Sequence, residues 1–166
     1  LDKNFKKLVN RSHDLLPIMD NKVIDLRTAE VRPRTRDDMF ALECPVNYIK
    51  PGEWTDEDVD ILNRLIRPLF CDDQEYIDWI QILFGSYLSG RISRQVVCHK
   101  GVGRNGKSKM IGIIHNIMGE FGGTLDKSAI VTSAGAVKSD RKGAHTSYLA
   151  AIDGKRFVSC QELEDG

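Results

Sequence analysis

The sequence predicts an α/β fold in which a parallel sheet follows a β-hairpin and a small helical region. Residues 95–119 run from a short apolar segment through a glycine-rich loop into an apolar helix. Residues 156–161 form a second apolar segment, which ends in a run of carboxylates. Because parallel strands need a crossover connection, we expect the strands at 95–98 and 156–161 to be adjacent or nearly adjacent in one sheet.

The N-terminal segment, residues 1–52, is expected to be built on the hairpin. Its start, residues 1–20, is basic and amphipathic, which favours a helix. Two β-prone runs separated by a short turn within residues 23–31 predict the hairpin itself. Residues 40–48 supply a third strand in this interpretation.

Residues 53–92 are expected to form a helical subdomain. Thr55, with Asp58 three residues later, is typical of a capping box at a helix start. The first helix carries an apolar stripe, and a second helix runs from about Asp73 to Gly90. We expect both stripes to lie in the core. They comprise Val59, Leu62, Leu65, Ile66 and Leu69 in the first helix, and Tyr76, Ile77, Ile80, Leu83, Phe84, Tyr87 and Leu88 in the second.

Residues 101–108, Gly-Val-Gly-Arg-Asn-Gly-Lys-Ser, match the pattern of a phosphate-binding loop. Glycines permit positive φ angles and let backbone N–H groups approach a phosphate, and the helix that follows adds its positive N-terminal end. In such a loop Lys107 contacts the β- and γ-phosphates of ATP, and Ser108 binds Mg²⁺. An ordinary glycine-rich turn is the alternative interpretation. The candidate nucleotide-binding residues are Gly101, Gly103, Arg104, Asn105, Gly106, Lys107, Ser108 and Lys109.

The second candidate segment is the acidic end of the strand at 156–161. Side chains alternate along a strand, so Glu162 and Glu164 share a face if the strand extends that far. A nucleotide hydrolase needs an acid at this place to hold the Mg²⁺ shell and to position water. We therefore assign Lys107, Glu162 and Glu164 as candidate catalytic residues, with Ser108 and Glu162 as metal ligands. Which glutamate acts in which role stays open, and a solvated acidic turn is the alternative.

Composition excludes several classes of protein. Of the 166 residues, 41% are hydrophobic and 29% are charged, as in a soluble globular domain. No apolar run approaches the ~20 residues that span a bilayer. The four cysteines are widely spaced, which argues against a zinc site or a disulfide framework and suits an intracellular protein. The chain begins without Met or a signal-peptide core, so we expect it to be a fragment.

Charge does not by itself indicate a nucleic-acid partner. The formal net charge is zero, whereas proteins that neutralise many phosphates usually carry a basic excess. The arginines are nevertheless clustered in one short stretch, which either touches nucleic acid or forms a solvated face of the hairpin. The cluster comprises Arg27, Arg32, Arg34 and Arg36.

Three segments together resemble a known family. The hairpin Val-Ile-Asp-Leu-Arg-Thr-Ala-Glu-Val-Arg-Pro, the segment Gly-Ser-Tyr-Leu-Ser-Gly at 85–90 and the loop at 101–108 are similar to poxvirus-type and phage-type primase–helicases. The stretch 153–162 resembles the acidic motif of the same family. Their ATPase belongs to the superfamily 3 helicases, a branch of the AAA+ P-loop proteins. The likeness spans about residues 20–166.

The resemblance implies an ATP- and Mg²⁺-dependent DNA helicase that acts as a ring, with a hexamer as the expected assembly. It also implies a primase domain upstream in the same chain and, for a viral protein, a location in the host cytoplasm or nucleus. Residues 93–166 would then be an ATPase core truncated at its C-terminal side. The family's sensor strand, arginine finger and DNA-gripping hairpin are expected after Gly166, so DNA would be contacted mostly by parts outside this sequence.

Two other classes of function stay open. A P-loop kinase acting on a small molecule needs the same loop but no ring, and it transfers phosphate to a metabolite. A nucleotide-stabilised interaction module would instead recruit partners through the region before residue 90, without a need for hydrolysis.

Overall fold

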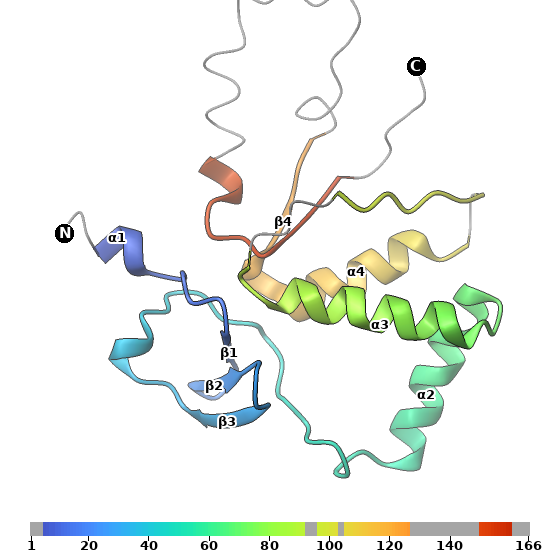
Figure 1. Cartoon of the computed structure of the whole chain (residues 1–166), viewed down its shortest axis with the longest axis horizontal. Helices are drawn as coiled ribbons and strands as arrows, with labels where there is room; N and C mark the ends of the chain where they lie inside the picture. Colours follow the sequence, from blue (N-terminus) through green and yellow to red (C-terminus); the bar gives the residue numbers. More distant parts are fainter. Residues whose placement is uncertain (1–4, 92–95, 103–104, 127–149, 161–166) are drawn as a thin grey trace, which may run out of the picture.

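The computed structural model describes residues 5–91, 96–102, 105–126 and 150–160 (Figure 1). Within these ranges the chain is a mixed α/β structure. A three-stranded antiparallel sheet comes first, three main helices follow, and a two-stranded parallel sheet forms last. The coarse α/β prediction is therefore confirmed.

The antiparallel sheet has the strand order β1 (Leu15–Ile18), β2 (Lys22–Asp25) and β3 (Glu30–Pro33). The pairing of β2 with β3 confirms the hairpin predicted over residues 23–31. Cross-strand register sets apolar residues opposite one another, which lets one face of the sheet join the core. Such pairs are Leu16 with Ile24 and Ile24 with Val31.

Strand β1 lies where the sequence favoured a helix, so that prediction is wrong for residues 15–18. Among the described residues 5–20, only a short helix forms, α1 (Phe5–Leu8). The reason is Pro17, which lacks a backbone N–H and would clash with the preceding turn of a helix. A proline is tolerated in β1 because this strand is at the edge of the sheet.

The third strand expected at residues 40–48 is also absent from the structure. These residues contribute one isolated bridge, between Cys44 and Ile18, in which the Cys44 N–H donates to the Pro17 carbonyl oxygen at 2.9 Å. Pro45 follows directly and has no N–H to continue a ladder. Strand β1 therefore completes the sheet in place of this segment.

Both predicted helix starts are confirmed. Thr55 caps α2 (Asp56–Ile66): its hydroxyl accepts the Asp58 N–H at 3.2 Å, and the Asp58 carboxylate accepts the Thr55 N–H at 2.9 Å. Asp73 caps α3 (Gln74–Leu88) by accepting the Tyr76 N–H at 3.1 Å. Each cap satisfies N–H groups that have no partner inside the helix.

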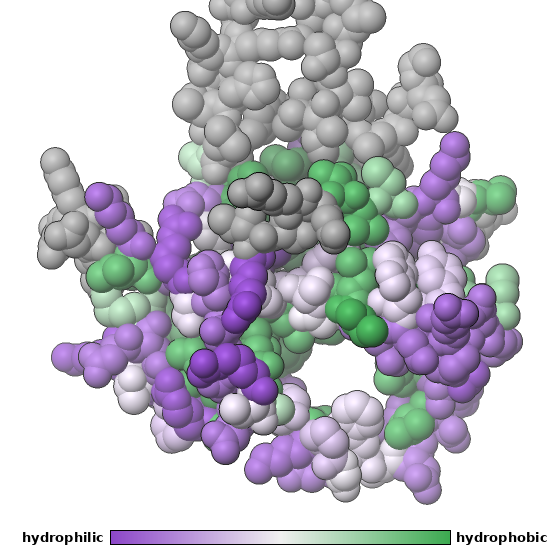
Figure 2. Space-filling view, in the orientation of Figure 1, coloured by the Kyte–Doolittle hydropathy of each residue, from purple (hydrophilic) through white to green (hydrophobic). Residues whose placement is uncertain are grey.

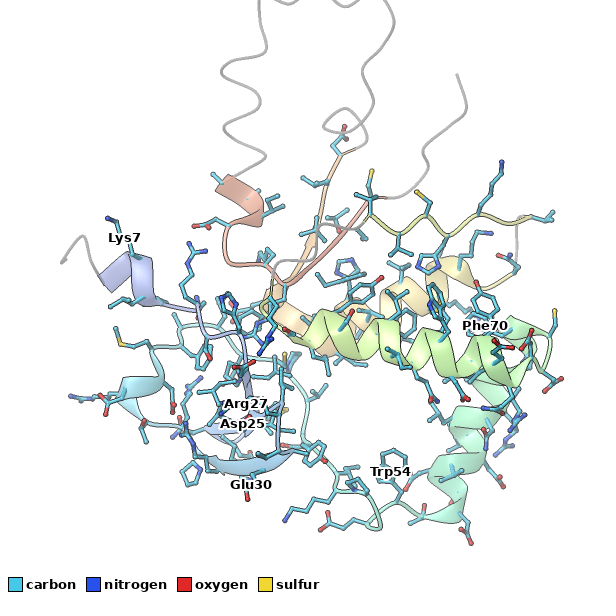
Figure 3. The ribbon with its side chains drawn as sticks, viewed as in Figure 1. Lys7, Asp25, Arg27, Glu30, Trp54 and Phe70 are labelled. Carbon is cyan, nitrogen blue, oxygen red and sulfur yellow. The ribbon has the colours of Figure 1, made fainter. Side chains whose placement is uncertain are left out.

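The apolar stripe of α2 was expected in the core, and this prediction is wrong for most of the helix. Val59, Leu62 and Leu65 are each about 40% exposed, and α2 has no buried residue. Figure 1 shows the reason: α2 projects from the body, and only its last turn meets α3. There the chain continues into η2 (Arg67–Phe70), and Phe70, labelled in Figure 3, lies against α3 and the start of α4. The hydrophobic cluster at this contact comprises Phe70, Ile77, Ile80 and Met110, with Ile66, Leu69, Leu83 and Phe84 around it.

The C-terminal part is built on α4 (Lys107–Met118), which leads through η3 (Gly119–Phe121) into β4 (Gly122–Thr124). Strand β4 pairs in parallel with β5 (Phe157–Ser159), with Gly122 opposite Phe157. The strand predicted over 156–161 is thus present at residues 157–159, and the described residues Arg156 and Cys160 lie outside it. Parallel pairing requires a crossover connection, so the chain between β4 and β5 cannot be a tight turn.

The partner expected for β5 was the segment at 95–98, and the described structure differs. Residues 96–100 form no strand, and Val96 is 90% exposed (Figure 1). The partner of β5 is β4 instead. Its sequence, Gly-Gly-Thr, has no apolar signal, so only the backbone hydrogen bonds reveal it.

One hydrophobic core joins the two ends of the chain. It takes residues from β1, β2, α4, η3 and β5, so the antiparallel sheet packs against the helix that follows the loop. The division into segments 1–52, 53–92 and 93–166 stays a prediction. The buried members of this core are Leu16, Ile18, Ile24, Cys44, Ile114, Met118, Phe121 and Phe157.

The surface carries paired charges over the hairpin. Figure 2 shows hydrophilic residues over the outer faces of the antiparallel sheet and of α2. Asp25 and Arg27 meet beside the hairpin turn (Figure 3), and this contact lowers the pKa of Asp25 to about 2. Three of the four clustered arginines have an acidic partner in the chain, as in a solvated hairpin face. The pairs are Arg27–Asp25 at 2.8 Å, Arg32–Asp38 in η1 (Arg36–Asp38) at 2.5 Å, and Arg34–Glu43 at 3.5 Å.

Three of the cysteines, Cys44, Cys71 and Cys98, are free thiols in different environments. Cys44 is buried, where desolvation raises its pKa to about 11, and Cys71 and Cys98 are exposed. No helix in the described ranges has the length and apolar character to cross a bilayer.

Candidate phosphate-binding site

The described part of the glycine-rich loop leads directly into α4. Gly106 caps this helix with φ +83°, in the left-handed region that glycine enters at little cost. A Cβ at this position would also collide with Leu69 of η2. Glycine is therefore required at residue 106 for both backbone conformation and space, and the helix axis begins where the loop ends.

Lys107, the first residue of α4, turns its side chain back into the loop. Its ammonium donates to the carbonyl oxygens of Gly101 and Val102, each at 2.9 Å, and to Asn105 Oδ1 at 2.6 Å. Gly101 provides room for this arrangement, because a Cβ there would lie 2.6 Å from Asn105 Nδ2. A cation is thus held inside a loop of backbone carbonyls and one amide side chain.

The start of α4 adds a favourable field for an anion. The first N–H groups of a helix have no partner inside it, and the helix dipole places partial positive charge there. Ser108 and Lys109 are exposed in this first turn. The structure therefore brings together five of the predicted nucleotide-binding residues in sequence order around the same helix end. They are Asn105, Gly106, Lys107, Ser108 and Lys109, with Gly101 within reach of the Lys107 ammonium.

Four candidate residues lie outside the described part of the chain: Gly103, Arg104, Glu162 and Glu164. Strand β5 ends at Ser159, three residues before Glu162. Within the described residues, His, Cys, Asp and Glu form no group of three that could hold a metal ion. The predicted pairing of Ser108 with Glu162 as Mg²⁺ ligands therefore stays a prediction.

A hydrogen bond that sequence reasoning missed connects α4 with β5. His115 Nε2 lies 2.7 Å from Ser159 Oγ, and the imidazole ring packs edge-on against Phe157 at 5.0 Å. Partial burial lowers the pKa of His115. The sequence places His115 on the inner stripe of α4, four residues after Ile111 and three before Met118, but it does not indicate Ser159 as the partner.

Arg156, immediately before β5, was also missed. Its guanidinium donates to the carbonyl oxygens of Leu88 at 2.7 Å, Ser12 at 3.0 Å and Leu15 at 2.7 Å. It also lies over the Phe121 ring, 4.6 Å from the centroid. Burial lowers the pKa of Arg156 to about 10, so it stays charged at neutral pH. This one side chain fixes the start of β5 to β1 and to the end of α3.

Comparisons with known proteins give no independent family assignment: neither the protein-family models nor the curated proteins contain a match to this chain.

Proposed function

We propose that residues 101–109 bind ATP, and that the chain is part of an ATP-driven DNA helicase of the superfamily 3 type. The observation that carries the proposal is the Lys107 ammonium, which is held inside a glycine loop at the N-terminus of α4. The charge of Lys107, the first backbone N–H groups of α4 and the dipole of this helix then all act at the helix N-terminus. That combination favours a polyphosphate over other anions.

The residues present fit a nucleotide with its metal ion. A Cβ at Gly101 or Gly106 would collide with Asn105 or Leu69, so the loop conformation needs both glycines, and Ser108 is exposed in the first turn of α4. Ser108 and Glu162 are the residues proposed to hold Mg²⁺, which would neutralise charge on the phosphates. In the same proposal, the parallel sheet of an AAA+-like P-loop domain contains β4 and β5. Helix α4 is then the helix that follows the phosphate-binding loop, and Glu162 or Glu164 positions water.

The helicase interpretation rests on the resemblance of three segments, and a ring follows from it. ATPases of this kind act at the boundary between subunits, so a neighbour would supply the arginine that stabilises the transition state. A P-loop kinase and a nucleotide-stabilised interaction module are the alternatives. Both would bind ATP through the same loop, so binding alone does not separate them.

ATP turnover by the complete protein that carries this sequence separates the three functions. The helicase predicts hydrolysis that single-stranded DNA stimulates and that appears only in an assembled ring, as light scattering would detect. Phosphate transfer to a metabolite by a monomer would favour the kinase. Partner binding that persists without any hydrolysis, and is lost when residues 1–90 are deleted, would favour the interaction module.

A further inference from the structure

Lys107 has all its hydrogen-bonding capacity occupied by its own loop. A lysine ammonium has three donors and no acceptor. Its three contacts here are the Gly101 and Val102 carbonyl oxygens and Asn105 Oδ1, and the contact to Asn105 is the shortest, at 2.6 Å. Asn105 is the one side chain in this set, so it is the one contact that sequence can change.

A bound phosphate would accept hydrogen bonds from the same three N–H donors of the Lys107 ammonium. Charge-assisted hydrogen bonds are stronger than neutral ones, so a phosphate oxygen and the loop acceptors compete for one ammonium. We propose that Asn105 is a positioning residue that holds Lys107 against its own loop, which we call the latch, and that a nucleoside triphosphate binds by taking Lys107 from Asn105. The inference rests on the proposed function and adds a step to it.

Gly101 leaves the space in which Asn105 and Lys107 meet. The amide nitrogen of Asn105 approaches Gly101 so closely that a Cβ would lie 2.6 Å from it. Any side chain at residue 101 would therefore push the Asn105 amide away from its present place. The contact between Asn105 and Lys107 therefore depends on the Asn105 amide and on the missing side chain of Gly101.

The latch makes a prediction opposite to that of a direct phosphate contact. If the latched form dominates the free protein, the apparent Kd is the intrinsic Kd divided by the fraction that is unlatched. Removing the amide then raises that fraction and tightens binding. If Asn105 instead contacts the phosphates, removing its amide weakens binding.

The first measurement needs no nucleotide. Reductive methylation of each lysine in the free chain is followed by mass spectrometry, in wild type, Asn105→Ala and Gly101→Ala. We expect Lys107 to react several times faster in both variants, on the order of threefold or more from the loss of a charge-assisted contact. Lys50, in the segment before α2, is the internal control and should not change. An unchanged Lys107 rate in both variants would overturn the latch.

The second measurement is the affinity for ATP with Mg²⁺. We expect Asn105→Ala to bind on the order of three to ten times more tightly than wild type. Asn105 is exposed, so the variant should fold. If wild type binds ATP and Asn105→Ala binds it more weakly, the latch is overturned while the proposed function stands. Absence of ATP binding by wild type would remove the proposed function, and the gating role of Asn105 with it.

Discussion

Arg156 shows how one side chain connects parts that are distant in sequence. Its guanidinium serves three carbonyl oxygens, of Ser12, Leu15 and Leu88, and it has no acidic partner among the described residues. A guanidinium presents five donors in a rigid planar fork, whereas an ammonium has three donors on a flexible stem. Stability here comes from geometry and not from an ion pair.

We predict that Arg156→Met lowers the free energy of unfolding by about 2–4 kcal/mol, because the three carbonyl groups lose a charged donor. Arg156→Lys should recover only part of this, since it keeps the charge but not the fork. Urea denaturation of the three proteins measures the differences. A loss below about 0.5 kcal/mol in Arg156→Met would show that water replaces the guanidinium at no cost.

His115 gives a prediction about pH. Burial lowers its pKa below the ordinary value of 6.5, so near that pH the unfolded chain binds more protons than the folded chain. The stability that neutral His115 contributes is therefore present above pH 6.5 and is lost as the pH falls through its folded pKa. The advantage of wild type over His115→Gln in free energy of unfolding should shrink between about pH 7 and pH 5. His99 shifts in the same direction in both proteins and cancels in the comparison. A constant difference across this range would contradict the assignment.

Among single residues, the sequence predicts the roles of those whose contacts lie close along the chain. The loop residues from Asn105 to Lys109 follow a pattern that needs only neighbours along the chain. Arg156 and His115 depend on partners 44 or more residues away, and no local pattern encodes such a pair. The contact of Asn105 with Lys107 was missed for another reason: it depends on the conformation of the loop that holds both residues.

Among the elements, α2 depends most on its own sequence. It buries no side chain, so its stability comes from the capping box at Thr55 and from its last turn against α3. We predict that Thr55→Ala costs the helix about 1 kcal/mol and speeds amide exchange across residues 56–66, with little change in global unfolding. Thr35→Ala, which removes a similar capping box at η1, is the matched control and should leave exchange in α2 unchanged. Unchanged exchange in Thr55→Ala would mean that other contacts hold α2.

The elements that sequence predicts well are those with their own start and turn signals. Thr55, Asp73 and the β2–β3 turn supply such signals, and the helices and hairpin follow. The elements that it misplaces have conflicting or absent signals. Pro17 lies in an apolar run that favoured a helix, and the Gly-Gly-Thr of β4 has no pattern at all. Pairing with another strand decides both cases: β1 pairs with β2, which follows it directly, and β4 pairs with β5, which is far along the chain. Propensity alone does not predict such pairing.

For the whole molecule, the shared core makes the antiparallel sheet part of the support for α4. Ile18 of β1 is 3% exposed in the same cluster as Met118 and Phe121. We predict that Ile18→Ala lowers the free energy of unfolding by about 2–5 kcal/mol, through lost burial and a cavity. Met19→Ala is the matched control, since Met19 is adjacent but exposed, and it should cost less than about 0.5 kcal/mol. Equal effects of the two changes would mean that the sheet is not coupled to the core.

The most direct test of the account is equilibrium binding of ATP with Mg²⁺ to this chain, measured by titration calorimetry or with a fluorescent ATP analogue. We predict measurable binding by wild type, a loss of at least about tenfold in affinity in Lys107→Ala from removal of the charged phosphate contact, and no change in Lys50→Ala. Lys50→Ala removes the same charge away from the loop. Equal affinity in Lys107→Ala and wild type, or no binding by wild type, would contradict the claim that this loop holds a nucleotide.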